Sequence, residues 1–410
     1  MTQKYNILFS GWFNVAHSYA IINCFQLLAL YENYKDRINF YIDERPYYNP
    51  EWSKIKKLVY GDSLNKILMD FQKYNKDLHK IDLEYRCTYE YDITVKNPWP
   101  VCIFYTAEFN NLEPYYFKNN NIIQTSLLEI TDHIHKNINK LYFTAPTKWS
   151  ADGLTFAKIP NNHNKVITHG VSSGLLQFKE NGRQMIRNKY NIKDDDIVLL
   201  NIGALTGNKS ILLILQVLNI IVNRYQKKNY KLILKGSKDL YNSQLIVKGY
   251  LDQLPQLNIT SSEIDNLINN YIILIFDTLT YEEMANLYSA GDLYLSPFIA
   301  EGFNLTPLEA LSCLRPIVIP ETGASIEYAK PIFENDPEIN KNFIYFIRSK
   351  VIDSSGKKIN EIDGNHFLEI VLNFKKSPLN SEKLLKYLNE NYSWSKVSHL
   401  LFKYFEEIIR

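Results

Sequence analysis

The stretch Ser296-Pro-Phe-Ile-Ala-Glu301-Gly-Phe-Asn-Leu-Thr-Pro-Leu-Glu309-Ala-Leu sets two glutamates eight positions apart, across a strand, a loop and the start of a helix. Apolar residues before it read as a buried strand, and Thr306 with the proline after it occupies positions that begin a helix. Backbone N–H groups in the turn would then point outward, where an anion can bind. The spacing directs both carboxylates to one cleft and predicts a nucleotide-sugar site.

Each glutamate also has a simpler interpretation. Thr306 and Glu309 have the spacing of a capping box, in which the glutamate only satisfies the start of the helix. Glu301 could be a solvated loop carboxylate. The residues alone leave these alternatives open.

Working outward from this stretch, strand-like runs alternate with helical ones along the whole chain, which is typical of βαβ units and parallel sheets. A stretch containing serine and glycine at 172–182 reads as a linker. We therefore expect an α/β protein with two doubly wound, Rossmann-like domains facing a cleft, over residues 1–175 and 183–380. Expected strands are residues 5–10, 38–42, 101–106, 141–145 and 165–168, then 197–202, 231–234, 272–276, 293–296 and 316–319.

Length and composition agree with two globular domains, because 410 residues exceed what one core usually supports and 46% of them are hydrophobic. A net charge of +2 argues against nucleic acid as a partner, although Lys54, Lys56 and Lys57 could form a local basic patch. Four cysteines without a C-x-x-C pair, no signal-like N-terminus and an interrupted apolar run at 211–222 favour a cytoplasmic protein.

The two glutamates resemble the E-x7-E signature of retaining glycosyltransferases of the GT-B fold, in particular family four. The resemblance implies that Glu301 lies beside the donor sugar, that Glu309 binds the nucleotide ribose, and that amides of Phe303, Asn304 and Leu305 hold the diphosphate. It also implies sugar transfer from a nucleoside diphosphate sugar, with retention, to a hydroxyl acceptor such as a glycan or glycolipid. No cofactor or metal is expected, and peripheral membrane contact is open.

A second segment of the expected site lies at 203–210, between a strand and an apolar helix. Gly203 lets the backbone approach a phosphate, and Lys209 supplies positive charge to a leaving diphosphate. The family carries an arginine where this chain has Ala204. Either a second cation comes from elsewhere, for which Arg187 and Lys235 are candidates, or backbone amides suffice, or the donor is unusual.

Two other function classes compete. The segment almost matches a P-loop, with Asn208 in place of the second glycine, and the run at 272–277 ends in an aspartate as P-loop proteins require. This predicts a magnesium-dependent NTPase or kinase. The missing arginine favours a non-catalytic binding subunit of the same fold.

The remaining matches extend the resemblance to most of the chain. The loop near Leu279 corresponds to the place where the family rests the nucleotide base. In the first domain, His17 lies where relatives have a phosphate loop, and Glu108 could orient or deprotonate the acceptor hydroxyl. For both residues the alternative is structural, a capping histidine and a satisfied loop glutamate. Apolar residues recurring every three to four positions predict that 381–410 is helical and packs back on the first domain.

Overall fold

The computed structural model describes residues 4–54, 60–376 and 381–410, so Lys56 and Lys57 lie outside the described residues. Contacts divide the chain into two compact units. Unit 1 comprises Met1–Gly170 with Asn391–Arg410, and unit 2 comprises Val171–Glu390.

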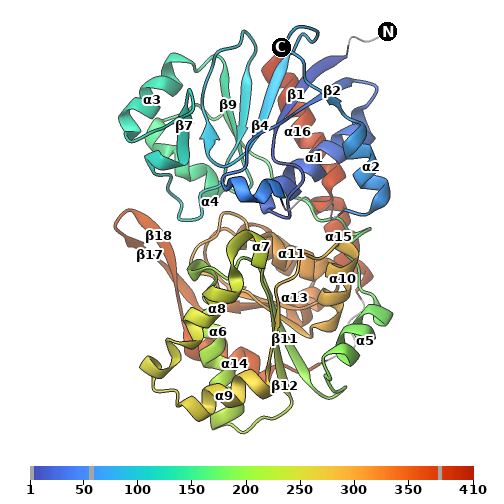
Figure 1. Cartoon of the computed structure of the whole chain (residues 1–410), viewed down its shortest axis with the longest axis vertical. Helices are drawn as coiled ribbons and strands as arrows, with labels where there is room; N and C mark the ends of the chain where they lie inside the picture. The colour runs from blue at the N-terminus through green and yellow to red at the C-terminus, as the bar shows by residue number, and fades with distance from the viewer. Residues whose placement is uncertain (1–3, 55–59, 377–380) are drawn as a thin grey trace. The chain divides into compact units, whose positions relative to one another are not determined.

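Unit 1 is built on a parallel sheet with strand order β10-β9-β6-β4-β1-β2-β3 (Figure 1). Parallel strands joined through helices are what the alternating pattern predicts, and this α/β expectation is confirmed. The strands are β1 Tyr5–Gly11, β2 Ile38–Glu44, β3 Gln72–Lys73, β4 Leu83–Cys87, β6 Val101–Phe104, β9 Leu141–Ala145 and β10 Asn164–Val166.

The helix α16 (Trp394–Ile409) packs on α1 (Ser18–Tyr34) within unit 1 (Figure 1). Rings of Tyr34 and Phe402 stack with centroids 3.9 Å apart, and Phe25 stacks on Trp394 at 5.4 Å. The predicted return of a C-terminal helix to the first domain is confirmed for α16, whereas residues 381–390, which the prediction also included, belong to unit 2. The other elements are α2 Asp62–Asp70, α3 Leu127–Lys136, α4 Lys148–Ala151, and a small sheet of β5 Tyr91–Asp92, β7 Phe117–Asn119 and β8 Ile122–Ile123.

The strand β4 lies between β1 and β6, yet the sequence pattern did not predict it. Its sequence, Leu-Glu-Tyr-Arg-Cys, places two charged residues in a strand whose residues are all buried. Glu84 and Arg86 pair with each other at 2.9 Å, and Arg45 joins them at 2.9 Å from Glu84. A buried strand can carry these charges because each meets its partner.

Unit 2 contains a second parallel sheet, with order β13-β12-β11-β14-β15-β16. An antiparallel hairpin of β17 (Ser349–Ser354) and β18 (Lys357–Ile362) follows β16 and projects from this sheet in Figure 1. β16 and the hairpin are absent from the predicted strands. The sheet strands are β11 Ile197–Ile202, β12 Tyr230–Lys235, β13 Ile272–Ile275, β14 Leu293–Leu295, β15 Ile317–Pro320 and β16 Ile344–Ile347.

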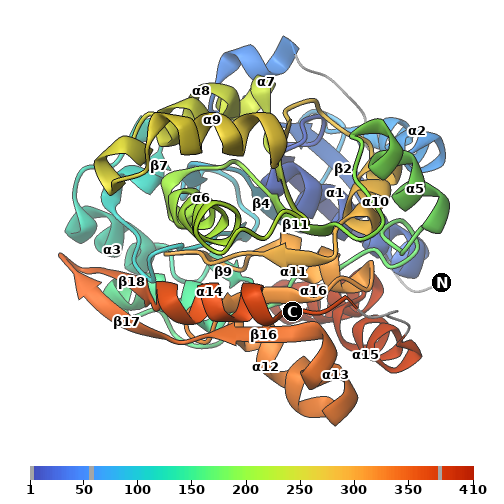
Figure 2. The ribbon, with the colours of Figure 1, turned by 90° about the horizontal axis from the view of Figure 1, so that it is seen from below.

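Helices cover both faces of this sheet, as Figure 2 allows the reader to follow. On one face α6 (Ile211–Asn219) and α14 (Gly364–Asn373) bury apolar side chains against alternate residues of β11 and β12.

The segment 172–182, predicted as a linker, ends inside the helix α5, which begins at Glu180. Further helices are α5 Glu180–Lys189, α7 Lys238–Tyr241, α8 Ser243–Leu251, α9 Ser261–Asn270, α10 Tyr281–Ala290, α11 Leu305–Ser312, α12 Ile326–Asn335, α13 Pro337–Phe343 and α15 Glu382–Tyr392.

Two further observations concern the described part of the chain. None of its helices combines the length and the apolar character that crossing a bilayer requires. All four cysteines are buried free thiols.

Candidate functional site

The candidate site in unit 2 is built from the loops that follow β11 and β14. These strands are neighbours and run parallel, so both loops leave from the carboxyl edge of the sheet, where ligands of such sheets bind. Asn201 donates its side-chain amide to the Leu295 carbonyl at 2.7 Å, and the Tyr294 hydroxyl donates to the Ile202 carbonyl at 3.0 Å. These buried bonds fix the ends of the two strands relative to each other.

Asn208 joins the two loops. Its backbone carbonyl accepts from the N–H of Ile299 at 2.7 Å, and its side-chain amide donates to the Ala300 carbonyl at 3.1 Å. The Thr206 hydroxyl donates to the Asn208 side-chain oxygen at 2.6 Å. The next residue on each loop completes the link, because the ammonium group of Lys209 contacts the carboxylate of Glu301. The first glutamate and the lysine therefore meet at one place.

The second glutamate lies on α11 in a buried environment. The Tyr288 hydroxyl of α10 donates to the Glu309 carboxylate at 2.6 Å. Burial raises the pKa of Glu309 to about 7, and the bond from Tyr288 acts in the opposite direction. Burial also raises the pKa of Tyr294, and the charges of Glu309 and Glu301 add to this rise. Both carboxylates are thus close enough to Tyr294 to act on it electrostatically.

The start of α11 differs from the expectation that Thr306 is its N-cap. The helix begins at Leu305, and Asn304 is the N-cap, with a positive φ of 68°. Asn304 donates its amide to the Ser296 hydroxyl at 2.8 Å, and Tyr328 donates its hydroxyl to the Asn304 carbonyl at 3.0 Å. The capping-box alternative for Glu309 is therefore wrong, because that carboxylate contacts Tyr288 instead.

The three residues expected to present amides to a diphosphate lie at this helix start. Phe303 is buried, and its ring lies 5.0 Å from that of Tyr328. Leu305 is the first residue of α11. Uncapped N–H groups in a first helical turn attract anions, since the helix dipole points its positive end there. The geometry is compatible with the expected phosphate contact, which stays a prediction.

Gly203 and Leu279 lie at the same edge of the sheet, on the loops that follow β11 and β13. A Cβ on Gly203 would lie 3.5 Å from the Lys209 side chain, an ordinary contact, and the Gly203 N–H donates to the Lys235 carbonyl at 3.0 Å. Leu279 is half-buried in the loop between β13 and α10. Ala204, at the position of the family's arginine, accepts a bond from the Ser243 hydroxyl at 3.0 Å.

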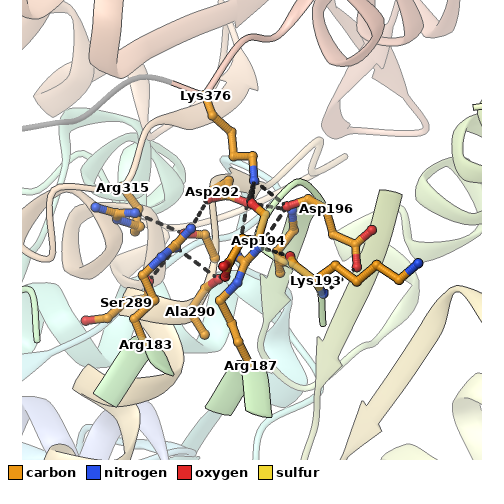
Figure 3. Close-up of polar contacts among 12 residues, drawn as sticks. Arg183, Arg187, Lys193, Asp194, Asp196, Ser289, Ala290, Asp292, Arg315 and Lys376 are labelled. Atoms are coloured by element: carbon orange, nitrogen blue, oxygen red, sulfur yellow. Dashed lines mark hydrogen bonds and ion pairs between the residues drawn. The ribbon is translucent and has the colours of Figure 1, made fainter. Parts of the chain in front are cut away.

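Arg187 cannot replace the missing arginine, because its partners lie at the amino ends of β11 and β14. Figure 3 shows these contacts. Arg187 donates to the carbonyls of Lys193 and Asp196, just before β11 begins, at 2.7 and 2.8 Å. It also pairs with Asp292, just before β14, at 3.4 Å. Arg183 joins the same carboxylate at 2.7 Å and Lys376 lies 4.0 Å from it. This buried group fixes α5 to the amino ends of the strands.

Lys235 lies at the correct edge instead. It is the last residue of β12, next to β11, and it is buried. Its ammonium group donates to the Gly236 carbonyl. Of the two cations considered for the missing arginine, only Lys235 ends a strand beside the Lys209 loop.

The P-loop interpretation depends on Asp277, and this carboxylate pairs with a lysine in the structure. Asp277, which mimics the aspartate of P-loop proteins, is exposed at the end of the edge strand β13 and pairs with Lys238 at 2.7 Å. Among residues 4–54, 60–376 and 381–410, no cluster of three His, Cys, Asp or Glu side chains could hold a metal ion.

His17 of unit 1 caps α1. Its Nδ1 accepts from the N–H of Tyr19 at 3.2 Å, and rings of Trp12 and Trp52 lie 5.1 and 5.3 Å from its own. Burial lowers the pKa of His17 to about 4. The imidazole is therefore neutral at physiological pH. Its contact with the Tyr19 N–H is that of a helix N-cap, which is the structural role given above as the alternative for His17.

Glu108 of unit 1 follows β6 and exposes its side chain. Its carbonyl accepts from the Trp149 indole N–H at 2.9 Å, and the N–H of Ala107 donates to Ser150 at 3.1 Å. The backbone of this loop is thus fixed while the carboxylate reaches solvent. Its expected role toward an acceptor stays a prediction.

Sequence reasoning missed two residues of the unit 2 site. Asn208 was noted only as a departure from the P-loop, although it bonds both loops. Tyr288 lies 21 positions before Glu309, on another helix, and no local pattern connects them. The only feature of the sequence that could have indicated this bond is a glutamate in an apolar helix following a helix that contains tyrosines, and this feature is not specific.

Comparisons with known proteins agree with this geometry. Residues 182–335, which include Lys209, Glu301 and Glu309, match the family described as Glycosyl transferases group 1. An uncharacterized glycosyltransferase of Methanocaldococcus jannaschii is 24% identical over 243 residues, covering 58% of this chain. The match spans 53% of that relative, about half of its length.

Solved structures match over nearly the whole chain. A glycosyltransferase from Rickettsia africae aligns with a TM-score of 0.64 and 13% identity, covering 100% of this chain and 99% of its own. Anabaena HepE, in complex with UDP and glucose, aligns with a TM-score of 0.61 and 14% identity, covering 98% and 100%. The chain therefore has the GT-B fold, and its second unit carries the group 1 match.

Proposed function

We propose that this protein transfers a sugar from a nucleoside diphosphate sugar to a hydroxyl acceptor, with retention of the anomeric configuration. The observation that carries the proposal is the contact between Lys209 and Glu301 at the carboxyl edge of the unit 2 sheet, inside the segment that matches group 1 glycosyl transferases. HepE, which has the same fold, is described in complex with UDP and glucose, in line with a nucleotide-sugar donor.

In this proposal unit 2 binds the donor. Glu309 accepts from the ribose diol, the amides of Phe303 to Leu305 hold the diphosphate, Leu279 contacts the base, and Glu301 holds the sugar. Lys209 neutralises the negative charge that develops on the departing diphosphate. Lys235 supplies the second positive charge, because it ends the strand next to the Lys209 loop.

The chemical step breaks the bond between the anomeric carbon and the diphosphate oxygen and forms a bond from that carbon to the acceptor oxygen on the same face. Glu108 orients the acceptor hydroxyl and accepts its proton as the new bond forms. His17 has no chemical step in this proposal, since its neutral ring holds the start of α1. No metal ion takes part, because Lys209, Lys235 and helix amides carry the charge.

Binding of the donor is tested by thermal shift with UDP, GDP, ADP and their hexose conjugates, for the native protein and for Lys209→Ala. A bound donor raises the melting temperature with the logarithm of its concentration over its dissociation constant. We expect at least one nucleotide sugar to stabilise the native protein and to stabilise the variant less. No stabilisation by any of them would favour a non-catalytic binding subunit.

Catalysis is tested by following release of the nucleoside diphosphate from the stabilising donor, in buffer that contains EDTA. We expect release to persist, and the anomeric proton coupling of the product to match that of the donor. Release that needs magnesium and occurs with ATP would instead support the P-loop alternative. An inverted product would contradict retention alone.

A further inference from the structure

A row of four tyrosines, two of them exposed, lies at the carboxyl edge of the unit 1 sheet. Tyr48 follows β2, Tyr89 follows β4, and Tyr115 with Tyr116 follows β6. Because these strands run parallel in one sheet, the loops after them leave from the same edge, where ligands of such sheets bind. We call these four residues the tyrosine platform.

The four rings are in contact with one another. Tyr48 and Tyr89 have centroids 5.3 Å apart, Tyr89 and Tyr116 5.9 Å, and Tyr116 and Tyr115 4.6 Å. Tyr48 is 61% exposed and Tyr115 is 44% exposed, while the other two are half-buried. Aromatic side chains normally bury their rings, so a continuous row of tyrosines with two exposed members indicates a surface that binds something.

The platform rests on a rigid base. The ring of Tyr89 packs edge-on against that of Tyr91 at 6.2 Å. The buried Tyr91 hydroxyl donates to the Thr106 carbonyl at 2.7 Å and accepts from the Thr106 N–H at 3.1 Å. The platform is therefore held in place before a ligand arrives, which reduces the entropy lost on binding.

Polar groups surround the rings. The phenol hydroxyls are themselves polar groups, and that of Tyr115 donates to that of Tyr116 at 3.4 Å. Two carboxylates act on these rings electrostatically. Burial raises the pKa of Tyr89, and the negative charge of Glu90 raises it further. Burial likewise raises the pKa of Tyr116, and the charge of Glu108 adds to that rise. The residue assigned to the acceptor hydroxyl is thus an electrostatic neighbour of the platform.

This combination fits a carbohydrate better than a lipid. A pyranose presents an apolar C–H face, which stacks on an aromatic ring, and a rim of hydroxyls, which bond with phenols and carboxylates. An acyl chain has no group that could form hydrogen bonds with these phenols and carboxylates, and an anionic membrane surface would be repelled by the carboxylates.

We propose that the tyrosine platform binds a saccharide chain of the acceptor, with successive sugar rings stacked on Tyr48, Tyr89 and the Tyr115–Tyr116 pair and the reacting hydroxyl at Glu108. The inference rests on the proposed glycosyl transfer and names its acceptor class. The acceptor is a carbohydrate, recognised over more than one sugar unit.

The test measures saccharide binding without a donor. The full-length protein is applied to a printed array of linear oligosaccharides of glucose, galactose, mannose and N-acetylglucosamine, beside the variants Tyr48→Ala/Tyr115→Ala and Tyr48→Phe/Tyr115→Phe. Tyr225→Ala in unit 2 removes an exposed tyrosine (55%) outside the platform and is the matched control. The melting temperature of each variant, with and without the stabilising nucleotide sugar, reports folding and donor binding.

We expect the native protein and the control to bind at least one oligosaccharide, the alanine variant to bind it at least tenfold more weakly, and the phenylalanine variant to keep most of the affinity. Equal binding by the alanine variant, or no binding by the native protein, overturns the platform while donor binding still stands. Tyrosine-dependent binding without any donor affinity would sink the glycosyltransferase proposal and keep the carbohydrate site. Binding of phosphatidylglycerol vesicles in place of saccharides would also overturn it.

Discussion

The ammonium group of Lys209 contacts the carboxylate of Glu301 although 92 positions separate them in the chain. Both side chains are largely withdrawn from solvent, at 17% and 8% exposure. Without a ligand the two charges neutralise each other. A bound donor can take both at once, because its diphosphate attracts the ammonium group and its sugar hydroxyls donate to the carboxylate.

Replacing Lys209 by alanine should reduce kcat about a hundredfold to a thousandfold, since one charge that stabilises the leaving group is lost in a site with little water. Nucleotide release at saturating donor measures this. Lys238→Ala, which removes an exposed lysine from the pair with Asp277, is the control and should leave kcat unchanged. A normal rate in the Lys209 variant would reject its role.

Replacing Glu301 by alanine should abolish transfer and leave the fold intact. The carboxylate that holds the donor sugar is lost, while Lys209 keeps partial access to water. Circular dichroism checks folding, and product formation checks transfer. Most of the activity remaining in this variant would contradict the assignment of Glu301 to the sugar.

Donor binding should depend on pH through Glu309. Burial raises its pKa to about 7, and only the ionised carboxylate is a full acceptor for the ribose hydroxyls. Affinity should therefore fall about tenfold from pH 8 to pH 6, as the ionised fraction falls by the same factor. A nucleotide sugar is the correct probe, since it has no terminal phosphate to titrate.

Glu309→Gln should bind the donor weakly and with no pH dependence between 6 and 8. The raised pKa of Glu309 also affects the free energy of unfolding, but with the opposite dependence on pH. Between about pH 4.5 and about pH 7 the folded protein keeps a proton on Glu309 that the unfolded chain has lost. The contribution of Glu309 to stability therefore falls as the pH rises through this range. Calorimetry at three pH values separates the two effects. An unchanged pH profile in the variant would assign the titration to another group.

Asn208→Ala should lower kcat about tenfold to a hundredfold by loosening the loop that carries Lys209. The side-chain bond to the Ala300 carbonyl, adjacent to Glu301, is lost, and small displacements of reacting groups are costly. Thr206→Val is a matched change, because it removes only the bond that Asn208 accepts. A lower melting temperature with normal kcat in the asparagine variant would show a structural role alone.

The sequence predicts a structural feature well when the residues that determine it lie close together in the chain. β11 coincides with its predicted range, and β9 does too, because continuous apolar runs mark buried parallel strands. The proximity of Lys209 and Glu301 is expected from strand ends in one sheet. Their chemical roles stay predictions.

What the sequence missed depends on partners far along the chain. Asn304 caps α11 in place of Thr306 because Ser296 and Tyr328 bond it from other elements. Arg187 looks available in the sequence and is buried against Asp292. β4 breaks the apolar pattern with Glu84 and Arg86, and only the folded sheet pairs these charges.

That buried pair provides a test in unit 1. Burial alone would raise the pKa of Glu84, but Arg86 and Arg45 outweigh it and hold the pKa at about 2. The folded-state value lies below the unfolded one, so this group stabilises the protein above about pH 4.5, and the contribution is lost as pH falls through about 2. Glu84→Gln should therefore destabilise unit 1 by roughly 3 to 5 kcal/mol at pH 7, because Arg86 stays buried without its nearest counter-charge and keeps the more distant Asp92, at 3.9 Å.

The measurement is urea unfolding followed by tryptophan fluorescence, which reports on unit 1 because all five tryptophans lie in its residues. Asp152→Asn, which breaks the exposed pair with Lys148, should change stability by less than about 1 kcal/mol. The gap between the native protein and Glu84→Gln should narrow from pH 4.5 toward pH 2, as the native carboxylate gains its proton. A gap that stays constant over this range would mean that the variant is weakened by packing rather than by the loss of charge.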